Sequence, residues 1–86
     1  MEEPMPMIVV ERSFDPPQSD AEHDLAARKL GPCCEMRNVR WVRSYVSLDR
    51  RRGFCQFEAA DAETVRQAHH AADVPYDRVW PSDVVE

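Results

Sequence analysis

Residues 43–79 read RSYVSLDRRRGFCQFEAADAETVRQAHHAADVPYDRV, and this stretch decides the fold. On both sides of a charged turn, apolar and polar residues alternate with the period of a strand. Asp49 and Gly53 bracket that turn. The pattern predicts two strands, over 39–47 and 54–59, that pair as a hairpin.

A helix and a short strand are predicted after the hairpin. Asp61 is a good N-cap, and apolar residues then recur at helical spacing as far as residue 72. Pro75 cannot continue a helix, and residues 78–80 offer a last short strand. The second half of the chain therefore reads strand, strand, helix, strand.

Upstream, the β-branched run MIVVER over residues 7–12 predicts a first strand. Ser19 or Asp20 can cap a helix that follows, and Gly31-Pro32 is expected to end or kink it. The whole order is β-α-β-β-α-β. It predicts an α+β, ferredoxin-like fold, with a four-stranded antiparallel sheet and two helices on one face.

Size and composition limit the function. The 86 residues make one domain, which we expect to span 7–81 between a disordered tail (1–6) and an acidic tail (82–86). A net charge of −5 argues against binding nucleic acid, and no apolar run reaches the ~18 residues that a membrane span needs. Three cysteines cannot all pair, and no signal-peptide pattern is found, so a reducing cytoplasm is expected.

Alternation along the hairpin also assigns residues to the two faces of the sheet. If Val42, Val46, Cys55 and Phe57 face the helices, the residues between them face away. The outward set is Trp41, Arg43, Tyr45, Phe54, Gln56 and Glu58, and Glu11 of the first strand can join it. Three aromatic rings beside an arginine and an acid are too apolar to be left in water.

We therefore expect a second copy of the sheet to cover this face, which would make a homodimer of the dimeric α+β barrel type. The pairing would enclose a cavity lined by Arg43, Tyr45, Gln56, Glu58 and Glu11. That cavity can be a binding pocket, in which Arg43, Tyr45 and Gln56 contact a ligand. The alternative is a polar dimer interface with satisfied ion pairs and no ligand.

The candidate metal ligands are Cys55, Glu58 and His69, with Glu11 behind them. His69 lies on the apolar stripe of the second helix, where a histidine can equally be a core residue that donates to a backbone carbonyl. His23 and His70 are expected at the surface. None of these residues shows the close CxxC or HxxxH spacing that identifies a metal site by itself, and Cys33-Cys34 reads as two inert thiols.

One set of motifs runs from residue 44 to 78: Ser-Tyr-Val-Ser, a turn with Asp, Phe-Cys-x-aromatic-Glu-Ala, Asp, Val-Arg, Ala-His and Pro-x-Asp-Arg. The set resembles that of a family of small bacterial nickel-binding proteins. The resemblance implies a ferredoxin-like subunit, a homodimer formed through the open sheet faces, and nickel or another divalent metal as the bound ion. Cys55, Glu58 and His69 match motif positions, whereas Ala60 and Asp73 depart from the family's usual proline and glycine.

Three functions remain open at this point. The first is a small cytoplasmic divalent-metal-binding protein that acts as a homodimer. The second is a dimeric-barrel enzyme or small-molecule binder that uses the open face, with Glu58 as base. The third is a dimeric module without a site. No phosphate loop, nucleophile elbow or dinucleotide fingerprint is present, so the sequence favours a protein that is not an enzyme.

Overall fold

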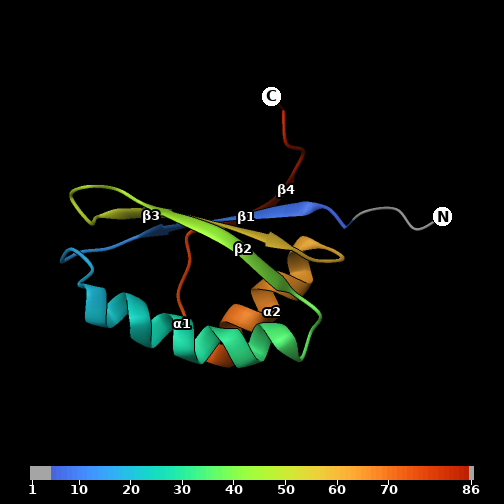
Figure 1. The fold of residues 1–86 in the computed structure, drawn as a ribbon, viewed down its shortest axis with the longest axis horizontal. Helices are drawn as coiled ribbons and strands as arrows, with labels where there is room; N and C mark the ends of the chain where they lie inside the picture. The colour runs from blue at the N-terminus through green and yellow to red at the C-terminus, as the bar shows by residue number, and fades with distance from the viewer. Residues whose placement is uncertain (1–4, 86) are drawn as a thin grey trace.

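The computed structural model describes residues 5–85, and its six elements follow the predicted order (Figure 1). They are β1 (Met7–Ser13), α1 (Asp20–Glu35), β2 (Arg40–Val46), β3 (Arg52–Glu58), α2 (Ala62–Ala72) and β4 (Arg78–Ser82). The four strands form one sheet in the order β2-β3-β1-β4, and every neighbouring pair is antiparallel. Figure 1 shows both helices on the same side of the sheet, which confirms the ferredoxin-like fold and leaves the other side uncovered by the described residues, 5–85.

Both helices begin where the sequence provides a cap. Ser19 caps α1: its hydroxyl accepts from the Glu22 amide at 3.1 Å, and the Glu22 carboxylate accepts from the Ser19 amide at 3.2 Å. At the start of α2, Asp61 Oδ1 accepts from the Thr64 amide at 2.8 Å. These bonds satisfy amides that have no partner inside the helix.

Gly31-Pro32 was expected to end or kink the helix, and the expected end is wrong, because α1 continues through Pro32 to Glu35. Leu30 and Cys34 lie one turn apart on the face of α1 that packs on the sheet, and both are buried. Proline in a helix interior costs about 3 kcal/mol, whereas burying an apolar side chain of this size contributes about 1.5–3 kcal/mol. Burial on both sides of the proline therefore outweighs the missing amide.

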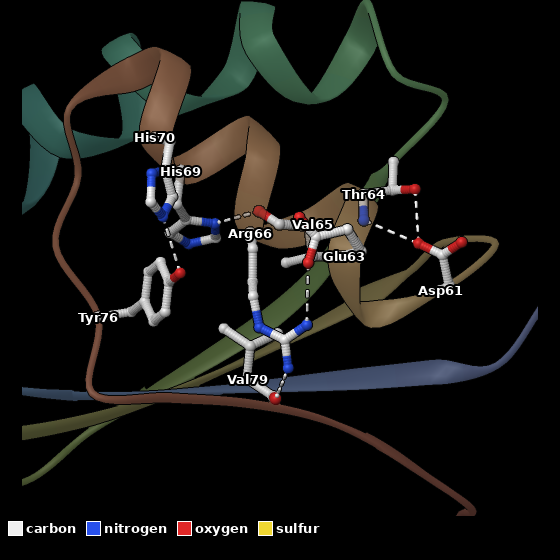
Figure 2. A network of polar contacts seen from close by, with 9 residues as sticks. All are labelled: Asp61, Glu63, Thr64, Val65, Arg66, His69, His70, Tyr76 and Val79. Atoms are coloured by element: carbon white, nitrogen blue, oxygen red, sulfur yellow. Dashed lines mark hydrogen bonds and ion pairs between the residues drawn. The ribbon is translucent and has the colours of Figure 1, made fainter.

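The core lies between the sheet and the helices, and its largest fully buried side chains come from β1, β3 and both helices. They are Phe57, Ile8, Leu30, His69, Val10 and Val65. Arg66 ties α2 to the edge strand, because its guanidinium donates to Val79 O at 2.8 Å (Figure 2).

One face assignment from the sequence is wrong. Trp41 was expected on the open face, but it lies opposite Phe57 and packs against the core, with ring centroids 5.4 Å apart. The register of β2 against β3 shifts between Trp41 and Arg43. A bulge of this kind inserts one residue, here Val42, and so reverses the parity on one side of it.

Residues 5–6 and 83–85, at the two described ends of the chain, are exposed. Residues 1–4 of the predicted tail lie outside the described range, while Met5 and Pro6 are exposed and precede β1 without regular structure. The last strand runs to Ser82, two residues beyond its predicted end. Within residues 5–85, no helix is long and apolar enough to cross a membrane.

Candidate functional site

His69 is the most unusual polar side chain in the core. It sits in the last turn of α2, on the same face as Val65 and Ala72, and none of its surface reaches solvent. Its Nδ1 lies 2.8 Å from Val65 O (Figure 2). A carbonyl oxygen can only accept, so Nδ1 carries the proton and donates it. The other ring nitrogen, Nε2, has no hydrogen-bond partner in the described structure.

Burial also fixes the charge of His69. It lowers the pKa of the imidazole from its ordinary value, and electrostatic interactions with Arg12 and His70 lower it further, against the opposing effect of the bond to Val65 O. The ring is therefore neutral at pH 7, with a free electron pair on Nε2. A neutral imidazole whose other nitrogen is held by a carbonyl is the arrangement that metal-binding histidines adopt.

Tyr76 lies against both histidines at the end of α2 (Figure 2). Its ring centroid is 5.6 Å from that of His69 and 5.7 Å from that of His70, and its hydroxyl is 2.9 Å from His70 Nε2. Phe57 contacts His69 from the sheet, edge to face at 5.5 Å. Aromatic rings thus fix the orientation of His69 on two sides.

A surface cavity of about 410 Å³ opens at this point, and both histidines line it. Asp73 also lines it and ends α2 as the C-cap, with a left-handed backbone (φ 57°). The C-terminal end of a helix carries partial negative charge, which favours cations. Two imidazoles, a carboxylate and this helix end therefore give the cavity the character of a cation site.

The sheet divides the four predicted metal ligands. Cys55 and His69 lie on the helix side and are buried, whereas Glu58 and Glu11 lie on the open face, opposite Met7 and Phe54 respectively. No group of three or more His, Cys, Asp or Glu side chains in residues 5–85 is placed to hold one ion. Within a single subunit, these four residues therefore cannot bind one metal ion together, because they lie on opposite faces of the sheet.

Cys55 is a weak donor in this setting. Its Sγ lies 3.0 Å from the Ser44 hydroxyl, and burial raises the pKa of the thiol despite Ser44 and Arg12. The side chain is therefore a neutral thiol at pH 7, whereas metals bind the thiolate. The charged guanidinium of Arg12 beside it further disfavours a cation.

The open face brings the predicted ligand-binding residues together. Arg43 lies opposite Gln56, and Tyr45 lies opposite Phe54. Tyr45 is 54% exposed and Phe54 41% exposed, so the rings are uncovered in the single chain.

Both acids on the open face already have partners. Glu11 accepts from the Trp80 indole at 2.7 Å, and Glu58 pairs with Arg40. The sequence prediction missed Trp80 and Arg40 as members of this face. Trp80 lies opposite Val9, and the register of β4 on β1 was not known from the sequence.

Sequence reasoning also missed Tyr76, Asp73 and the cavity at the end of α2. It placed His70 at the surface, where the structure has it, and left His69 as either a core residue or a ligand. Pro75 signals the loop that carries Tyr76, but nothing in the spacing shows that this loop folds back onto the helix.

Comparison with known proteins adds a family and a fold. Residues 9–81 match the model of a family described as nickel responsive protein SCO4226-like. The crystal structure of SCO4226 from Streptomyces coelicolor A3(2) superposes with a TM-score of 0.82 at 14% identity, and the alignment covers 93% of this chain and 99% of that one. At that identity the structural likeness supports the fold alone. Among curated proteins, no sequence matches the chain.

Proposed function

The chain belongs to the SCO4226-like family of nickel-responsive proteins, and we propose that it is a small divalent-metal-binding protein, with nickel as the first candidate, that acts as a homodimer. The observation that carries the proposal is the free Nε2 of His69. A buried polar atom without a partner costs about 1–3 kcal/mol, and a bound metal ion would remove that cost. Imidazole is also a donor that nickel prefers.

His70 and Asp73 could complete the set with His69 only if side chains rearranged, because no three such groups in residues 5–85 are placed to hold one ion. All three line one cavity at the negative end of α2. Tyr76 lies against both imidazoles, and its hydroxyl is hydrogen-bonded to His70 Nε2. Binding by both histidines would therefore require Tyr76 to turn away.

The other predicted ligands rank lower. Cys55 is a neutral thiol beside a guanidinium, which opposes a cation there. Glu11 and Glu58 face away from His69 and lie four positions apart along the sheet, roughly 13 Å, so only a second, oxygen-rich site built with a partner subunit could use both. That second site stays a prediction from the family resemblance.

The homodimer is proposed on the exposed rings of the open face. Tyr45, Phe54 and Trp80 are each at least 40% exposed, on a sheet that no other part of residues 5–85 covers. An isologous contact, in which each subunit offers the same patch, buries such rings with the fewest new requirements. Acids and arginines on the same face give the charges that a twofold contact can pair.

A cytoplasmic location is part of the proposal. All three cysteines are free, as expected where glutathione keeps thiols reduced.

A second candidate is a small-molecule binder on the open face. It is favoured by one observation, the placement of Arg43 against Gln56 and Tyr45 against Phe54, because this joins a cation, an amide and rings on one surface. It predicts binding of an organic ligand that does not respond to metal.

Calorimetric titration of Ni²⁺ and Zn²⁺, with the mass measured by light scattering, tests the proposal. We expect stoichiometric binding by a dimer and at least a tenfold loss of affinity in His69→Gln. His23→Gln, on α1, is the matched control and should bind as the wild type does. Unchanged affinity in His69→Gln, or a folded monomer, would contradict the respective half of the proposal.

A further inference from the structure

A second cavity lies on the helix side of the sheet, away from the face that we assign to the dimer. Its volume is about 260 Å³. It opens between the end of β1, the first half of α1 and the connection from α2 to β4, which Figure 1 shows rising from the helix layer to the sheet. Its apolar walls are Phe14, Leu25, Val74 and Pro75.

Arg12 is the polar group that makes this cavity unusual. It is only 7% exposed, and its guanidinium lies 4.9 Å from the centroid of the Phe14 ring. Its Nε donates to Pro75 O at 3.2 Å. Within residues 5–85, no carboxylate lies within ion-pair distance of Arg12, although four other arginines have such a partner.

A buried charge without a counterion costs several kcal/mol, and three nearby groups are chemically able to partner Arg12. Cys55 is a neutral thiol, because burial raises its pKa. Asp77 is exposed and accepts from the Ser13 hydroxyl. Glu22, at the cavity, accepts from the Ser19 amide in the cap of α1. None of them neutralises the guanidinium by direct contact.

Gln18 is a second buried polar group that lines the same cavity. It is 6% exposed, and its Oε1 has no hydrogen-bond partner in the described structure. The carboxamide offers two N–H donors and one oxygen acceptor, so after a flip about its last bond it can present either to a ligand. Lys29 lines the cavity as well, and its Nζ lies 3.4 Å from Asp73 O.

We propose that this cavity binds a small organic carboxylate with an apolar body. The carboxylate accepts from the Nη groups of Arg12, with Gln18 and Lys29 as further donors. The body lies against Phe14, Leu25 and Val74. Because the volume falls just below the ~300–1000 Å³ range of drug-sized sites, the acid is short, with a branched aliphatic chain or a single ring.

The binding of a carboxylate would supply the counterion that Arg12 lacks. A guanidinium and a carboxylate form two parallel charge-assisted hydrogen bonds, which are stronger in a partly buried site than in water. The inference does not depend on metal binding, since it uses none of the groups at the end of α2 except the shared wall residues Val74, Pro75 and Asp73.

Amide NMR titration with isovalerate and benzoate tests the inference. We expect saturable shifts at Phe14, Gln18, Leu25 and Val74, and no such shifts with the neutral isosteres isoamyl alcohol and benzyl alcohol. Inorganic phosphate tests whether charge alone suffices, and it should not saturate the site, because it lacks the apolar body.

Two variants locate the site. Arg12→Met should lower affinity at least tenfold. Since loss of Arg12 could prevent folding, Leu25→Asp is the second variant: Leu25 is more than half exposed, so the change leaves the core intact and places a negative charge at the cavity wall. It should weaken benzoate binding at least tenfold, while His23→Gln leaves it unchanged.

Failure of both acids to saturate at millimolar concentration would overturn the inference. So would equal binding of the alcohols, saturable binding of phosphate, shifts that cluster outside this cavity, or unchanged affinity in Leu25→Asp.

Discussion

Acidification from pH 7.5 to 5.5 should destabilise the folded chain through His69. Burial lowers the pKa of this imidazole in the folded state, whereas in the unfolded chain it titrates near the ordinary 6.5. Below pH 6.5 the imidazole of His69 is therefore protonated in the unfolded chain while it is still neutral in the folded chain. Stability contributed by the neutral ring is complete above pH 6.5 and falls as the pH drops below it.

The size of the effect has an upper limit. At pH 5.5, one unit below 6.5, the unfolded imidazole is protonated about ten to one, which draws the equilibrium toward unfolding by up to about 1.4 kcal/mol. A domain of this size is stable by only about 4–13 kcal/mol, so the loss is measurable. It corresponds to a fall in Tm of up to about 6–11 °C.

Urea unfolding of the metal-free protein at both pH values measures this difference. His69→Gln should be less stable at pH 7.5 but should lose most of the change between the two pH values, and His70→Gln should retain it. Asp49 and Asp61 do not add to the difference between the two pH values. Hydrogen bonds lower the pKa of both carboxyl groups, so the stability that they contribute is lost only as the pH falls below about 4. An equal pH dependence in wild type and His69→Gln would refute the reasoning.

Three further changes test other parts of the structure. Phe54→Glu places a charge in the proposed dimer contact and should halve the mass seen by light scattering, whereas Leu48→Glu, at the exposed hairpin tip, should not. Asp73→Gly removes the strain of a left-handed non-glycine cap (φ 57°), which costs roughly 1–2 kcal/mol, and should stabilise the chain in urea unfolding by that amount less the extra chain entropy of glycine; a loss of stability would count against the cap assignment. Asp61→Ala removes the N-cap bond to the Thr64 amide and should lower the Tm, and an unchanged thermal melt would show that the bond contributes nothing.

The fold was predictable because local signals and chain order agree. Alternation along β3 placed Phe54, Gln56 and Glu58 away from the helices, and the structure pairs them with residues of the open face. Trp41 was assigned to the wrong face because a single inserted residue in β2 reverses which face the alternate side chains point to. No residue type in the strand indicates this insertion.

The helix through Pro32 shows a second limit of the sequence. The local rule for proline is correct about the lost hydrogen bond, but it carries no information about what the rest of the helix buries. Leu30 and Cys34 decide the outcome, and their burial depends on the sheet.

The candidate site was predictable only in part. Helical spacing placed His69 on the buried stripe, and strand alternation already sets Cys55 and Glu58, three residues apart, on opposite faces of β3. The cavity at the end of α2 depends on a loop that returns Tyr76 to the helix, and the buried Arg12 without a counterion depends on contacts between three segments. Contacts of this kind, between segments far apart in the chain, produce no periodic pattern of residues from which they could be predicted.

The most direct test of metal binding at His69 is the state of its ring nitrogens, measured by ¹⁵N–¹H correlation spectroscopy of the imidazole before and after adding one equivalent of Zn²⁺. The account predicts a proton on Nδ1 and none on Nε2 in the metal-free protein, followed by a shift of Nε2 alone when the ion binds. A proton on Nε2 before the addition, or an Nε2 signal that does not move while the ion binds elsewhere, would contradict it.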